Sequence, residues 1–90
     1  MYISEITFKN INSVGKIKAI VSIVIDEMIA IEGIKIIEDS RGIFLGMPRR
    51  KENDTLVDII HPISKEGRRI LENTIINEYL MWVEDTEISA

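Results

Sequence analysis

The chain has 90 residues, of which 46% are hydrophobic and 29% charged, the composition of one small globular domain. It contains no cysteine, which excludes a disulfide framework and a thiolate metal site. No apolar run approaches the roughly 20 residues of a membrane helix, and residues 1–5 lack the features of a signal peptide. We therefore expect a cytoplasmic protein that does not contact a membrane.

The net charge of −4 is unevenly distributed along the chain. Up to Arg69, eleven Lys and Arg residues stand against ten acids, whereas the last 21 residues hold five acids and no base. A near-neutral body can present a cationic face despite an acidic pI. The alternative is that the acids only keep the protein soluble. We predict a single domain over residues 1–90 with a short, frayed acidic tail at 84–90.

The first part of the chain predicts three β-strands. Residues 2–9 and 16–25 alternate between apolar and other side chains, and the second run is rich in β-branched residues. Residues 28–38 predict a third strand whose alternation slips at Glu32-Gly33, which indicates a bulge or a sharp bend. Turn residues separate these strands at 10–15 and at Asp26-Glu27.

Two further strands flank a cationic segment. Residues 42–47 predict the fourth strand and residues 56–60 the fifth, with Arg49-Arg50-Lys51 in the loop that joins them. Consecutive strands with short connections predict antiparallel pairing, because parallel strands need long crossovers. We therefore predict a five-stranded, mainly antiparallel sheet.

After Pro62 the apolar residues follow the period of a helix, which we predict at about 65–82 with Ser64 as its N-cap. One face of this helix is apolar and wide enough to pack on a sheet. That face consists of Leu71, Ile75, Tyr79 and Trp82, with Ile76, Leu80 and Val83 at its edge. The predicted fold class is α+β.

No arrangement of residues in the sequence predicts catalysis. His61 is the only histidine, and a lone histidine cannot supply the ligands of a zinc site. We predict that it forms structural hydrogen bonds, and that Asp26-Glu27 and Glu38-Asp39 are solvated turn charges. The expectation is a protein that is not an enzyme and that uses no metal, no cofactor and no small-molecule substrate.

The basic residues form two clusters that suit phosphate. Arg49, Arg50 and Lys51 are contiguous, and Arg68-Arg69 lie near a helix N-terminus, where positive charge opposes the helix dipole. The planar fork of arginine donates two parallel hydrogen bonds to phosphate. The other interpretation is that the first cluster is a solvated loop whose charge is balanced by Glu52 and Asp54.

Two motifs carry a family resemblance. They are Gly42-Ile43-Phe44-Leu45-Gly46-Met47-Pro48, with basic residues after it, and Asp58-Ile59-Ile60-His61-Pro62-Ile63. With weaker matches over about residues 2–82, the chain resembles the stage V sporulation protein G family of bacterial septation and gene-expression regulators. The resemblance implies a small β-sheet with a C-terminal helix, a homodimer, and binding of DNA and, in some members, RNA.

Carried over by position, the resemblance places the basic residues of the family on Arg50, Lys51 and Arg68. Arg49 stands where a small polar residue is usual. Residues 52–55 are shorter than the Thr-Pro-Asp-Gly-Glu turn of many members.

The leading hypothesis is a dimeric, nucleic-acid-binding regulator of gene expression, linked to septation and sporulation. Its predicted binding residues are Arg49, Arg50, Lys51, Arg68 and Arg69. The dimer is expected to form through the sheet, because Ile20 and Val24 add apolar surface that one helix does not cover. The alternative is a protein-interaction module in cell division or septum regulation that does not contact nucleic acid.

Overall fold

The computed structural model describes residues 1–10 and 15–89, and side chains within residues 1–9 and 15–85. The predicted turn at 10–15 lies mostly outside the described residues. The elements in chain order are β1 (Ile3–Asn10), β2 (Ile17–Ile25), β3 (Ile29–Asp39), β4 (Gly42–Gly46), β5 (Arg49–Glu52), β6 (Thr55–Asp58) and α1 (Lys65–Ser89). The predicted α+β class, with an antiparallel sheet and one C-terminal helix, is confirmed.

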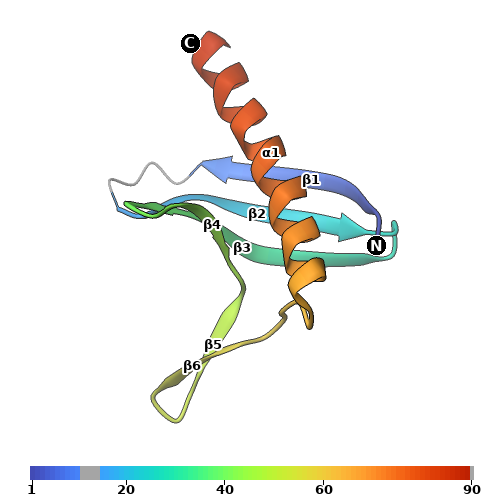
Figure 1. The fold of residues 1–90 in the computed structure, drawn as a ribbon, viewed down its shortest axis with the longest axis vertical. Coiled ribbons are helices and arrows are strands. Elements are labelled where there is room, and N and C mark those ends of the chain that lie inside the picture. Colours follow the sequence, from blue (N-terminus) through green and yellow to red (C-terminus); the bar gives the residue numbers. More distant parts are fainter. Residues whose placement is uncertain (11–14, 90) are drawn as a thin grey trace.

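The strands form two sheets rather than the predicted single sheet. β1 to β4 make a four-stranded antiparallel meander in sequence order, and β5 pairs only with β6 in a separate hairpin (Figure 1). The residues predicted as a cationic loop are therefore strand β5, and the predicted fifth strand does not join the main sheet. Pro48 stands at the departure point, and a residue without an N–H cannot continue a sheet's hydrogen bonds.

The β5–β6 hairpin closes through a tight turn at Asn53 and Asp54. Both residues have positive φ values, 48° and 65°. Two left-handed residues between antiparallel strands are typical of a type I′ turn, and Asn and Asp tolerate that conformation better than other non-glycine residues. The Ile59 N–H donates a 2.8 Å hydrogen bond to the Pro48 carbonyl oxygen and so ties the base of the hairpin together.

The bulge predicted in the third strand is confirmed. The pairing of β2 with β3 shifts register between Val21 and Ile23, opposite the segment that contains Gly33. Gly33 has a φ of 85°, a left-handed conformation that glycine adopts without a steric penalty. The shift lets Ile31 and Ile34 both enter the core although their spacing breaks strict alternation.

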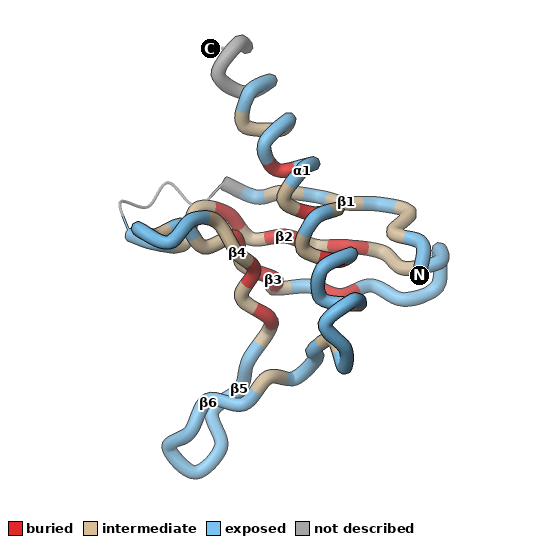
Figure 2. Tube along the Cα trace, in the orientation of Figure 1, coloured by how far each residue is buried: buried red, intermediate tan, exposed pale blue. Residues whose placement is uncertain are grey.

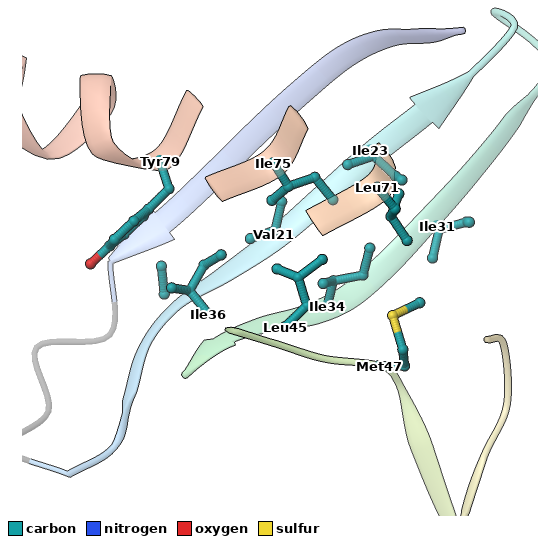
Figure 3. Close-up of a cluster of buried hydrophobic side chains, with 11 residues drawn as sticks. Val21, Ile23, Ile31, Ile34, Ile36, Leu45, Met47, Leu71, Ile75 and Tyr79 are labelled. Carbon is teal, nitrogen blue, oxygen red and sulfur yellow. The ribbon is translucent and has the colours of Figure 1, made fainter. Parts of the chain in front are cut away.

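α1 packs across one face of the four-stranded sheet (Figure 1). Its apolar face is largely as predicted, because Leu71, Ile75 and Tyr79 are buried and Trp82 is half-buried. Leu80, predicted at the edge of this face, is exposed instead. Leu71, Ile75 and Tyr79 meet the inward residues of the strands (Figure 3). The strand residues of this core are Ala19, Val21, Ile23, Ile31, Ile34, Ile36 and Leu45, joined by Met47.

The helix begins and ends where capping and composition allow. The Gly67 N–H donates a 3.0 Å hydrogen bond to Ser64 Oγ, which confirms Ser64 as the N-cap. The helix continues to Ser89, beyond the predicted span of about 65–82, because neither Gly nor Pro stops it after Trp82. Within the described residues, no helix has an apolar stretch long enough to span a bilayer.

Candidate nucleic-acid interface

The β5–β6 hairpin projects away from the sheet and the helix, and nearly all of its residues are exposed (Figure 2). Across it, Arg49 lies opposite Asp58 and Lys51 lies opposite Leu56. Because side chains alternate along a strand, Arg49 and Lys51 share one face of the hairpin and Arg50 lies on the other. The three contiguous cations therefore do not form one patch on one side.

Each hairpin cation already has an acidic partner. The Arg49 Nε atom lies 2.9 Å from Asp58 Oδ1, and Arg50 Nη2 lies 3.1 Å from Glu52 Oε2. Lys51 Nζ lies 3.7 Å from Asp54 Oδ1. The charge balance that the sequence offered as an alternative is thus present, with Asp58 as an additional partner.

These pairs are weak restraints on the cations. The three basic side chains are 52–72% exposed, and exposed ion pairs contribute only about 0–1 kcal/mol. Phosphate oxygens compete with carboxylates for the same donors and give charge-assisted hydrogen bonds of similar geometry. An incoming phosphate can therefore replace each carboxylate at small cost.

The helix cations occupy a different place. Arg68 Nη1 lies 3.4 Å from Glu72 Oε1, and Arg69 Nη2 lies 3.9 Å from Glu66 Oε1. Both arginines line a shallow hollow beside β4, together with Ile43, Lys65, Asn73 and Ile76. Arg49 lines another hollow, with Leu56, Val57, Asp58 and His61. The structure therefore arranges the five predicted residues as two clusters rather than one site.

The remaining candidates have local roles. His61 is exposed, and its Nδ1 lies 3.1 Å from the carbonyl oxygen of the adjacent Pro62, so its hydrogen bond joins no distant segments. Asp26 accepts a 3.0 Å hydrogen bond from the Tyr2 N–H, so it ties its turn to the start of β1 rather than only facing solvent. No group of three or more His, Asp or Glu that could hold a metal occurs among the described residues.

Asp39 and Arg41 form the shortest ion pair among the described residues. Arg41 Nη2 donates to Asp39 Oδ2 at 2.8 Å, and the Arg41 backbone N–H donates to Asp39 Oδ1 at 2.8 Å. The hydrogen bond from the Arg41 guanidinium, and to a smaller extent the one from the Arg41 backbone N–H, hold the pKa of Asp39 below its ordinary value. The Arg41 guanidinium carbon lies 5.4 Å from the centre of the Phe44 ring, a cation–π contact.

Alternation in the sequence places Lys9 and Lys18 on the polar faces of their strands, but sequence reasoning did not bring them together with Lys35 on one uncovered face of the sheet. Lys9, Lys18 and Lys35 have no ion-pair partner within the described part of the chain. Strand parity is the signal that could have found them, since each stands next to a residue that faces α1.

Comparison with known proteins supports the resemblance seen in the sequence. The SpoVG family model matches residues 1–81. A protein of Agathobacter rectalis named "Putative septation protein SpoVG" is 40% identical over 94% of this chain and 99% of its own length. Proteins with the same name are 44% identical in Finegoldia magna, over 88% of this chain and 74% of theirs, and 35% identical in Clostridioides difficile, over 100% and 99%.

Proposed function

The chain belongs to the SpoVG family, and from that premise we propose that it is a nucleic-acid-binding regulator of gene expression that acts in septation and sporulation. Its relatives are named as septation proteins, which supports the cellular process. DNA is the proposed ligand of the hairpin and helix cations, and RNA shares the phosphate chemistry that they recognise. No catalytic step is part of this proposal.

The observation that carries the proposal is the exposed β5–β6 hairpin. The hairpin carries Arg49, Arg50 and Lys51 outside the hydrophobic core. A nucleic acid can therefore contact either face of the hairpin. The arginines can offer two parallel hydrogen bonds to one phosphate. Arg68 and Arg69 would add contacts from the first turns of α1.

The proposal includes a homodimer that forms through the sheet at the outer edge of β1. β1 pairs with β2 on one side only, and an edge strand offers unpaired backbone groups to a second copy. Beyond Tyr79, which contacts Phe8 of β1, the helix extends past this edge (Figure 1). Leu80 and Met81 there are 49% and 51% exposed. A two-fold axis beside β1 would bury them and double the number of cations.

Replacing the hairpin cations tests the proposal. In Arg49→Gln/Arg50→Gln/Lys51→Gln, we expect affinity for a fluorescent DNA duplex to fall at least about tenfold at low salt, because these contacts are electrostatic. Unchanged affinity would remove the hairpin from the interface. For the dimer, light scattering at micromolar concentration should give twice the monomer mass, and Leu80→Arg should shift it toward the monomer. A monomeric wild type would contradict the dimer.

A second function has one observation in its favour. An apolar cavity of about 180 Å³ lies between the end of the sheet and the start of α1, and its lining includes Ile31, Met47, Ile60 and Leu71. Ile63, which follows the lining residue Pro62 in the chain, is 94% exposed, so this region could hold an apolar side chain of a division protein. Under this alternative, Ile63→Asp would abolish the recovery of one specific protein, and the hairpin variant would not.

A further inference from the structure

The face of the four-stranded sheet opposite α1 is covered by no element that the structure describes. Strand register sets its composition. Lys9 lies opposite Ile20, Ile20 lies opposite Lys35, and Lys35 lies opposite Gly46, which gives one row across all four strands. The adjacent row, which contains Phe8, Val21 and Ile34, faces α1. Because neighbouring rows point to opposite sides, the first row faces away from the helix.

We propose that this open face binds single-stranded nucleic acid. The inference rests on the proposed function, that the chain binds nucleic acid. It adds a second binding surface and specifies a single-stranded ligand for that surface. The surface is separate from the β5–β6 hairpin, which belongs to another sheet.

The charge of the open face is free to act on a ligand. Lys9, Lys18 and Lys35 have no ion-pair partner among the described residues, whereas each of the five predicted binding residues in the hairpin and the helix has one. Lys18 is the extra residue where β2 shifts register against β3 between Ile17 and Ala19, so it lies next to the pair of Ile17 and Ile37. With neighbouring strands about 4.8 Å apart, Lys9 and Lys35 stand about 10 Å apart across Ile20. They can therefore contact different phosphates of one strand.

On the side of Lys35 toward Ile37 and Phe44 the face is apolar. Ile37 lies opposite Phe44, and a Cβ placed on Gly46 would come within 2.7 Å of Ile37 Cδ1. The Ile37 side chain therefore lies across the glycine instead of standing up from the sheet. Because Gly46 has no side chain, nothing projects from the sheet at this position, and a planar group can approach Phe44.

Arg41 completes a stacking position at Phe44. Its guanidinium contacts the ring and is held there by Asp39, whose side chain is only 10% exposed, while the Arg41 side chain is 78% exposed. Nucleic-acid bases stack on aromatic rings and on guanidinium planes. The pair is therefore ordered before a ligand arrives and still open to solvent.

The combination favours a single strand over the other polyanions. A duplex hides the faces of its bases and offers nothing to Phe44, and an acidic protein surface has no planar groups in regular succession. A four-stranded sheet that is open on one face is also how RNA-recognition domains hold single strands. Packing of two copies face to face is opposed by the unpaired lysines, which would bring like charges together.

Two triple variants with equal loss of charge test the inference. Lys9→Gln/Lys18→Gln/Lys35→Gln and Arg49→Gln/Arg50→Gln/Lys51→Gln are each titrated against a short oligouridylate and a DNA duplex, with circular dichroism to confirm folding. We expect the open-face triple to weaken oligouridylate binding at least about tenfold and duplex binding less. It should also flatten the single-strand salt slope by about 2, because each neutralised phosphate contributes about 0.7.

Photocrosslinking locates the contact directly. With wild-type protein and an oligouridylate that carries 4-thiouridine, mass spectrometry should find crosslinks on the segment that contains Arg41 and Phe44. Phe44→Leu should weaken single-strand binding about tenfold, and Arg41→Gln gives an independent reading if Phe44→Leu does not fold. Wild-type single-strand affinity in the open-face triple, or crosslinks confined to β5–β6, would overturn this inference and leave the proposed function intact. No binding of wild-type protein to either probe would overturn both.

Discussion

Arg49 lies directly opposite Asp58 across the β5–β6 hairpin, and its Nε donates a 2.9 Å hydrogen bond to the Asp58 carboxylate. The cation that the sequence predicts for phosphate contact is therefore already bound to an acid of its own chain. Because Arg49 is half-exposed, this pair contributes little to folding and can be exchanged. A phosphate that binds Arg49 through Nε must displace Asp58.

The first prediction follows from that exchange. Asp58→Asn removes the competing charge, so affinity for a DNA duplex should rise several-fold at low salt and the gain should shrink as salt is added. The free energy of unfolding should change by less than about 1 kcal/mol. Glu84→Gln, on an exposed helix position, is the matched control for net charge. An equal gain in both variants would show that only net charge matters.

The second prediction concerns the core under α1. Ile75 is fully buried and Leu80 is 49% exposed on the same helix. Ile75→Ala should lower the free energy of unfolding by about 2–5 kcal/mol, because it removes buried methyl groups and leaves a cavity. Leu80→Ala should cost less than about 1 kcal/mol at concentrations where the protein is monomeric. Urea denaturation measures both, and similar losses would mean that α1 packs on another face.

The third prediction concerns the start of α1. Ser64→Ala removes the acceptor of the Gly67 N–H and should destabilise the protein by about 1 kcal/mol. Ser40→Ala, in an exposed turn, changes the same atoms without a cap and should be nearly neutral. If thermal unfolding gave equal shifts for the two variants, the helix would begin elsewhere.

The fourth prediction concerns pH. The pKa of Asp39 is lowered by its hydrogen bonds to Arg41, so the folded state favours the ionised carboxylate. That stabilisation is fully present above the ordinary aspartate pKa of about 4 and is lost as the pH falls through the lower folded value. Asp39→Asn should therefore be less stable than wild type near pH 6, with the difference in melting temperature narrowing toward pH 3. A constant difference for Asp39→Asn across this pH range would contradict the assignment.

The sequence predicts most of the main sheet and the helix because their residues are buried on one side. Alternation in residues 16–25 and the helical period after Pro62 both follow from the contact of one face with the core. The bulge at Gly33 is visible for the same reason, since it restores the inward phase. Burial of one face imposes the spacing of the apolar residues, so the strand or helix can be predicted from that spacing.

The β5–β6 hairpin and the C-terminal end of α1 do not bury one face against the core. Residues 49–58 are exposed on both faces, so no alternation distinguishes strand β5 from a loop, and only the turn-forming Asn53-Asp54 indicates a hairpin. The helix continues beyond its predicted apolar face because neither Gly nor Pro follows to end it. The ion pairs of the cations depend on side-chain geometry across strands and turns. Glu52 and Asp54 are partners that the sequence offers, whereas Asp58 becomes a partner of Arg49 only because the hairpin brings the two residues opposite each other.

The central claim is that the hairpin cations bind the phosphates of nucleic acid. The most direct measurement is the affinity of wild-type protein for a DNA duplex over a series of salt concentrations. With about six phosphates neutralised per dimer, log K should fall against log salt with a slope of about −5, and Arg49→Gln/Arg50→Gln/Lys51→Gln should have a clearly shallower slope. A slope near zero in the wild type, or the same slope in the variant, would contradict it.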